Sequence, residues 1–213
     1  MARPGDGGEV TVFRFEDHPF WVFSLKVYGN QGVPAACIAL QERRAIDVNL
    51  LLFCTWIGES GRGVLSESEL EAARAAVETW NREIVCALRA VRNRLKGGMR
   101  PIPKDRSDVL REMILEIEVK SEHIEQIALT AVVTRPGNPA LAVERRGKDA
   151  VANIAAYFFR LGFTLDAEDA RKIALVLDPA FPGIGRPKLE EICRAAGAAP
   201  RRARPSKGTS GAN

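Results

Sequence analysis

The stretch 46–57 constrains the fold of this chain more than any other part of the sequence. After Asp47, only Asn49 and Thr55 interrupt a run of apolar residues that ends at Ile57. The Asp47 side chain stands where it can cap the first turn of a helix. A helix that is apolar on nearly every side has to be surrounded by other helices. The sequence therefore predicts a buried core helix that begins after Asp47.

Length and composition predict a folded protein of ordinary size. The 213 residues are 46% hydrophobic and 27% charged, which suits one well-cored domain, or one domain with a small appendage. The longest apolar run is far shorter than the roughly 20 residues that a membrane-spanning helix needs. The N-terminus is acidic and lacks the basic start and apolar core of a signal peptide. We therefore expect a cytoplasmic protein with no membrane contact.

The net charge of +4 is concentrated at the C-terminus. From Arg186 onward, seven basic residues stand against Glu190 and Glu191, which leaves the rest of the chain close to neutral. A basic tail of this kind could attract nucleic acid.

The four cysteines show none of the close pairing of a zinc site or a redox motif. They are Cys37, Cys54, Cys86 and Cys193. We expect small buried side chains with inert thiols. A catalytic Cys–His pair would need one of them beside His18 or His123, with a third group to orient the base.

Helical spacing predicts the order of the elements before residue 135. A helix is expected from Pro19 to Gly29, followed by a small-residue helix from Pro34 to Arg44. A capping box at Ser66 opens a helix of about 30 residues, and a second long apolar stripe runs from Leu110 to Ala131. The loop between them, 97–103, is short, so the two long helices should form an antiparallel hairpin.

A break at 135–147, rich in Pro and Gly, predicts a linker before a smaller helical unit. Within that unit, Thr164 or Asp166 should cap one helix, and a last helix should start at Pro187. The expected organisation is a flexible segment 1–16, a helical bundle 17–134, a linker 135–147, a helical unit 148–197 and a disordered basic tail 198–213.

Several separated motifs resemble those of one known group of proteins. They are Phe20-Trp21-Val22-Phe23-Ser24-Leu25, Gly32-Val33-Pro34-Ala35-Ala36-Cys37 and Asp47-Val48-Asn49-Leu50-Leu51-Leu52-Phe53-Cys54 with Trp56. In these motifs the chain, over roughly 18–130, resembles a bacterial family of small helical proteins classed as conserved hypothetical. The family has no established activity, so the resemblance implies no catalytic residues.

A first candidate site is a small-molecule or enzyme pocket among the first three helices. Asp47 and Asn49, at the mouth of the core helix, could line it together with Gln41, Ser24 and Tyr28. The alternative, which we favour, is that Asp47 caps the helix, Asn49 bonds locally in its first turn and the others satisfy buried backbone groups.

A run of glutamates on the second long helix is similar in composition to carboxylate metal bundles. Those bundles need Glu-x-x-His pairs, but the residues three before His123 and His18 are Lys120 and Phe15. The sequence therefore predicts no metal and no cofactor. We expect a solvated acidic face, partly neutralised by Lys120 and by the basic residues of 89–96. The glutamates are Glu112, Glu116, Glu118, Glu122 and Glu125.

A second candidate site is the turn 181–185, Phe-Pro-Gly-Ile-Gly, which resembles a helix-hairpin-helix motif. Gly183 and Gly185 would let the backbone approach a nucleic-acid phosphate, and Arg186 and Lys188 would add charge. The alternative is that the turn only connects two helices.

These observations predict an all-α protein, namely a helical bundle with a long antiparallel hairpin and a smaller helical C-terminal unit. Since no catalytic group emerges, we expect a non-enzymatic interaction or accessory protein with a protein partner. Nucleic-acid binding through the C-terminus and a pocket among the first helices are the two alternatives. The sequence does not predict the oligomeric state.

Overall fold

A computed structural model of the chain describes residues 18–198, and this range is built from helices without any strand. The all-α prediction is confirmed. The predicted flexible segment 1–16 and the predicted basic tail beyond Ala198 lie outside the described residues. The helices, in chain order, are α1 (Pro19–Tyr28), α2 (Val33–Arg44), α3 (Val48–Glu59), α4 (Glu67–Trp80), the π-helical segment η1 (Asn81–Val85), α5 (Cys86–Leu95), α6 (Lys104–Thr130), α7 (Val143–Arg160), α8 (Ala167–Leu177) and α9 (Arg186–Ala198).

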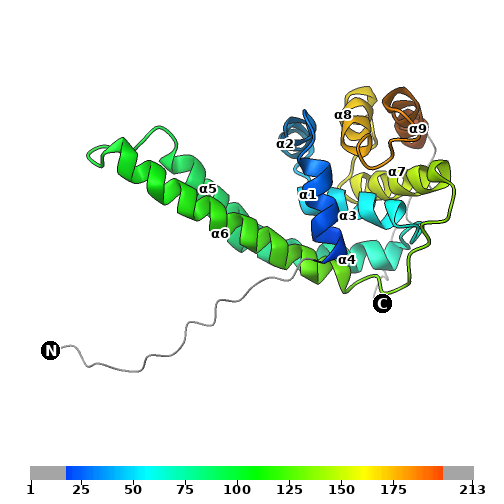
Figure 1. Ribbon diagram of the computed structural model, residues 1–213, viewed down its shortest axis with the longest axis horizontal. Helices are drawn as coiled ribbons and strands as arrows, with labels where there is room; N and C mark the ends of the chain where they lie inside the picture. The colour runs from blue at the N-terminus through cyan, green and yellow to red at the C-terminus, as the bar shows by residue number, and fades with distance from the viewer. Residues whose placement is uncertain (1–17, 199–213) are drawn as a thin grey trace, which may run out of the picture.

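Helix α3 is the centre of the body, as predicted (Figure 1). Asp47 is its N-cap, and the carboxylate accepts the Asn49 backbone N–H at 2.7 Å. Every residue from Asn49 to Gly58 is buried. Helix α7 packs along α3, and the two backbones approach closely where Gly58 faces Ala150. One continuous apolar core surrounds this pair of helices, because α1, α2, α4, α8 and α9 all contribute buried side chains to it.

The helix predicted to run unbroken for about 30 residues contains a π-helical segment. Helices α4 and α5 are continuous through η1, in which the Cys86 N–H bonds to the Asn81 carbonyl, five residues back. A π-segment inserts one extra residue into a helical turn and is often found near functional sites. Here it brings the side chain of Asn81 against α6, where the amide lies 3.3 Å from Glu125. Apolar spacing alone does not reveal such an insertion.

Helices α5 and α6 project from the body as an arm (residues 86–130) with the loop at its far end (Figure 1). The root of the arm is held by aromatic side chains. The Trp80 indole donates to the Ser121 carbonyl at 3.0 Å, and Trp21 of α1 stacks on His123 with 4.2 Å between ring centroids. Beyond this root, α5 and α6 lie against each other.

The C-terminal helices pack directly onto the body. Helix α7 begins at Val143, five residues before the expected unit, and Asp166 is the cap of α8. Arg44 of α2 pairs at 2.8 Å with Asp169, a fully buried carboxylate on α8. The division into a bundle and a separate C-terminal unit stays a prediction.

Candidate functional site

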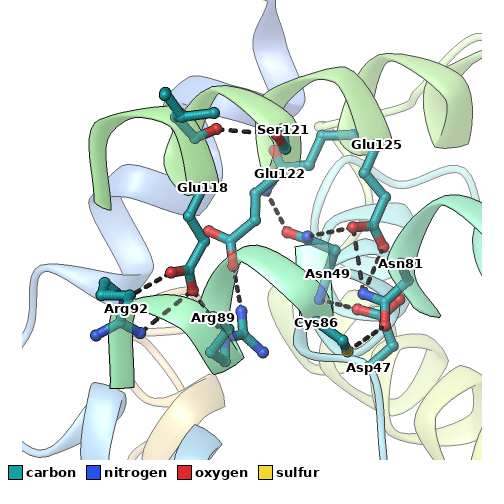
Figure 2. A network of polar contacts seen from close by, with 12 residues as sticks. Asp47, Asn49, Asn81, Cys86, Arg89, Arg92, Glu118, Ser121, Glu122 and Glu125 are labelled. Carbon is teal, nitrogen blue, oxygen red and sulfur yellow. Dashed lines mark hydrogen bonds and ion pairs between the residues drawn. The ribbon is translucent and has the colours of Figure 1, made fainter. Parts of the chain in front are cut away.

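A network of polar side chains fills the junction between the N-terminus of α3, the π-segment and α6 (Figure 2). The Asn49 amide donates to Glu125 at 3.2 Å, and its oxygen accepts the amide of Gln126 at 2.8 Å. Asn81 donates to Glu125 from the π-segment at 3.3 Å. Asn49, Glu125 and Gln126 are all buried. The network therefore connects α6, at the root of the arm, to the core helix.

Two carboxyl groups meet in this network. Glu125 is 1% exposed and shares a hydrogen bond with Asp47. Burial raises the pKa of Glu125 well above its usual range, and the hydrogen bond to Asp47 and the negative charge of Asp47 raise it further. Glu125 is therefore protonated at neutral pH and can donate its proton to the Asp47 carboxylate.

The outer part of the network is made of ion pairs between α5 and α6. Arg89 lies 2.8 Å from Glu118 and 2.5 Å from Glu122, and Arg92 lies 2.6 Å from Glu118. Burial opposes ionisation of Glu118, but the hydrogen bonds from Arg92 and Arg89 outweigh it and lower its pKa. At Glu122 burial dominates, and the pKa is raised despite Arg89. The two arginines cross-link the arm.

The predicted solvated acidic face is therefore wrong for Glu118 and Glu125, which are buried. Neutralisation by Arg89 and Arg92 is confirmed. The residues that complete the network from outside the core helix were not predicted. Glu118, Ser121 and Glu125 recur at three- and four-residue spacing on α6, a polar row that could have marked the side facing α5.

The structure separates the four residues of the predicted pocket. Asp47 and Gln41 line one cleft of about 390 Å³, together with Asn81, Cys86 and Tyr157. The Tyr157 hydroxyl accepts the Asp47 backbone N–H at 2.8 Å, a contact from α7 that the sequence did not indicate.

The other two predicted pocket residues lie elsewhere. Asn49 points away from the cleft into α6, so the expected local bonding in the first turn is wrong. Tyr28 is at the end of α1, outside the residues that line the cleft.

The cysteines divide into two groups. Cys37, Cys54 and Cys193 are buried, as predicted, and burial raises the pKa of the Cys37 thiol to about 12. Cys86 is exposed, contrary to the prediction, because it starts α5 at the edge of the cleft and not in the core. Its pKa is also raised, by burial first and by the nearby carboxylates.

The candidate phosphate-binding residues lie in and just after the turn before α9, but the two basic side chains among them form ion pairs with acidic residues of this chain. Gly185 adopts a φ of 81°, and Gly183 lies against Val143 of α7. Arg186 pairs with Asp178 at 3.0 Å, and Lys188 pairs with Glu191 at 2.9 Å. Phosphate binding by Gly183, Gly185, Arg186 and Lys188 stays a prediction.

A row of large apolar side chains on α6 is exposed to solvent. Their spacing of three or four residues follows a heptad pattern interrupted by Lys120. Of the predicted stripe, Ser121 is buried and Ala128 packs against the core, whereas the large apolar members Leu110, Met113, Ile117 and Ile124 are exposed. The exposed fractions are 47% for Leu110, 55% for Met113, 49% for Ile117, 37% for Ile124 and 41% for Ile127.

A second apolar row follows α5 and adjoins the first. It consists of Leu88, Val91 and Leu95, of which Val91 is half exposed and the leucines are partly exposed. At 100° per residue, this row lies roughly 100–160° around α5 from Arg89. The α6 row lies roughly 120–180° around α6 from Glu122. Because Arg89 and Glu122 pair with each other, both rows lie on the side of the arm that faces away from this ion pair. We call the two rows together the arm face.

Two further properties concern the described residues only. Within 18–198, no three His, Cys, Asp or Glu side chains are grouped so that they could hold a metal ion. None of the helices in this range combines the length and the apolar composition needed to cross a membrane.

These features define an all-α protein with a buried acid network at the root of a two-helix arm. The chain belongs to the family described as "Protein of unknown function (DUF2390)", whose model matches residues 19–129. The match covers α1 to α5 and nearly all of α6, and so includes the core helix and the arm. It confirms the resemblance to a helical family without an assigned activity. No curated protein and no solved structure matches the chain.

Proposed function

We propose that this protein is a non-enzymatic interaction protein that binds a helical partner along the arm face. The observation that carries this proposal is the arm face itself, in which Leu110, Met113 and Ile117 are each about half exposed. A contiguous exposed apolar patch usually marks an interaction site. Fully burying one side chain of this size contributes about 1.5–3 kcal/mol, so covering the face would be strongly favourable.

The spacing of the arm face favours a helix as the partner. Leu110, Ile117 and Ile124 are seven residues apart, and Met113 and Ile127 occupy the second apolar position of the heptad. This pattern fits knobs-into-holes packing against another helix.

The polar network has a supporting role in this proposal. Its buried side chains bond one another, with Asn49 bonded to both Glu125 and Gln126, although the Gln126 side-chain oxygen has no partner. Several hydrogen bonds between the same two helices restrict the movement of the junction. The network would therefore hold the arm at a fixed angle to the body and present the arm face to the partner.

Site-specific photo-crosslinking in cells tests the proposal. A benzophenone amino acid would replace Ile117 on the arm face or, as a matched control, Leu115. Leu115 is 41% exposed but lies roughly 160° around α6 from Ile117. We expect a discrete crosslinked species from position 117 and little from position 115. Equal crosslinking at both positions, or none, would refute binding through the arm face.

A further inference from the structure

We infer that the partner on the arm face is a second copy of this chain, whose arm packs antiparallel against the first to complete a four-helix bundle. The inference rests on the proposed function, because it names the occupant of the arm face. A two-helix hairpin with one apolar face is half of such a bundle. Two identical halves can cover each other's apolar rows through a two-fold axis.

The position of Lys120 selects the direction of packing. This residue occupies the heptad position between Met113 and Ile127, and it is the one charge within the α6 row from Leu110 to Ile127. In a parallel pair, Lys120 would face Lys120 of the second copy inside the apolar face, which is strongly unfavourable. An antiparallel pair avoids this contact.

The antiparallel register is self-complementary. If Ile117 faces the second copy's Lys120, the same register places Leu110 opposite Ile127 and Met113 opposite Ile124 of the second copy. Glu116 of one copy then lies beside the second copy's Lys120, and the two-fold axis repeats this pair. The lysine thus gains a carboxylate partner in the antiparallel dimer.

Charge along the arm supports the same direction. The stretch 94–106 around the loop carries five basic residues against Asp105, whereas 107–125 carries six acids against Arg111 and Lys120. Parallel arms would bring two basic ends together. Antiparallel arms place each basic end beside the partner's acidic half, which is electrostatically complementary.

The mass of the full-length protein in solution, measured by light scattering and sedimentation over a range of concentrations, is the first test. We expect a dimer. Lys120→Glu and Glu116→Lys should each raise the dimer dissociation constant by roughly tenfold to a hundredfold, because two like-charge contacts form per dimer. An equimolar mixture of the two variants should restore a dimer, since every contact is then between opposite charges.

Matched controls separate this effect from misfolding. Leu115→Glu introduces a charge on the other side of α6 and should leave the dimer intact. Circular dichroism should give equal helix content for every variant, and rescue in the mixture is itself incompatible with a folding defect. Absence of rescue, or an equal effect of Leu115→Glu, would overturn the inference.

A distance measurement tests the direction. A spin label at Arg106, in a chain with Cys86→Ser, should lie roughly 38 Å from its counterpart along an antiparallel pair, from 1.5 Å of rise per residue. In a parallel dimer the two labels would be neighbours, and that result would overturn the antiparallel arrangement.

The failures of the two proposals are distinguishable. A monomer at all concentrations, together with a crosslink from position 117 to another protein, would overturn the inference that the partner is a second copy. The proposed interaction function would still hold. A crosslink from Ile117 to the same chain supports both. Equal crosslinking from positions 117 and 115 would refute both proposals.

Discussion

The carboxyl group of Glu125 on α6 is hydrogen-bonded to Asp47, the residue that caps the core helix α3. This hydrogen bond connects the root of the arm to the core helix. Burial keeps a proton on Glu125 at neutral pH in the folded state. In the unfolded chain the same carboxyl group ionises near pH 4.3.

This difference makes stability depend on pH. Because the folded-state pKa is raised, the contribution of Glu125 is fully present below about pH 4.3 and is lost as the pH rises toward the folded-state pKa. In that window, unfolding free energy should fall by about 1.4 kcal/mol per pH unit from this group.

Glu125→Gln should remove this slope, because glutamine keeps the shape and can donate to Asp47 without titrating. Urea denaturation between pH 5 and pH 8 measures it, with the exposed Glu112→Gln as the control. The stability advantage of Glu125→Gln over the natural chain should grow with pH. If the unfolding free energies of the two proteins changed equally with pH, Glu125 would not retain its proton in the folded state.

Asn49 is the second connection between α3 and α6. Asn49→Ala would leave the buried amide of Gln126 and one oxygen of Glu125 without this partner. We expect a loss of about 1–3 kcal/mol of unfolding free energy. In a double-mutant cycle with Gln126→Ala, the two effects should be coupled by roughly 0.5 kcal/mol or more. Asn93→Ala, at an exposed position of α5, should be nearly neutral; additive effects in the cycle would argue against a shared network.

The helical framework could be predicted from the sequence because its signals are local. Asp47 and Ser66 cap the helices that they were expected to cap, and glycine and proline mark the ends of others. The sides on which helices meet depend on the whole fold. On α6, Ile117 belongs to the predicted apolar stripe but is exposed, whereas the polar Glu118 is buried and pairs with arginines of α5.

The candidate site was predicted only in part, for the same physical reason. Asp47 could be identified because a cap is a local feature. Glu125 stands 78 positions further along the chain, and its burial depends on how α6 crosses α3 and on the π-segment that presents Asn81. No spacing rule within one helix carries that information.

Asp169 provides a test of how α2 is held to α8. It is fully buried and lies 2.8 Å from Arg44 and 2.5 Å from Arg43. Asp169→Ala removes the buried acceptor of both arginines, which keep Asp166 as a partner, so we expect a loss of about 1.5–3 kcal/mol in unfolding free energy. Glu168→Ala removes the neighbouring but exposed acid and should cost at most about 1 kcal/mol. Similar losses for both variants in thermal or urea unfolding would show that burial of Asp169 is not decisive.

Two core helices approach each other closely where Gly58 of α3 meets α7. A Cβ atom at position 58 would lie 2.4 Å from the Ala150 backbone nitrogen and 2.6 Å from the Ala150 Cβ, so Gly58→Ala can be accommodated only if the two helices separate. Alanine is the better helix former by about 1 kcal/mol, yet overpacking at a backbone contact should outweigh that gain. We expect a net loss of about 1–3 kcal/mol in unfolding free energy.

Gly183→Ala is the matched control for Gly58→Ala, because its Cβ would meet Val143 at an ordinary 3.4 Å. It should change the unfolding free energy by less than about 0.5 kcal/mol. Both variants can be compared by urea denaturation monitored by helix content. If Gly58→Ala were as stable as the natural chain, there would be space for an extra methyl group between α3 and α7, contrary to the observed packing. The helix pair would then not be the rigid centre on which the arm is mounted.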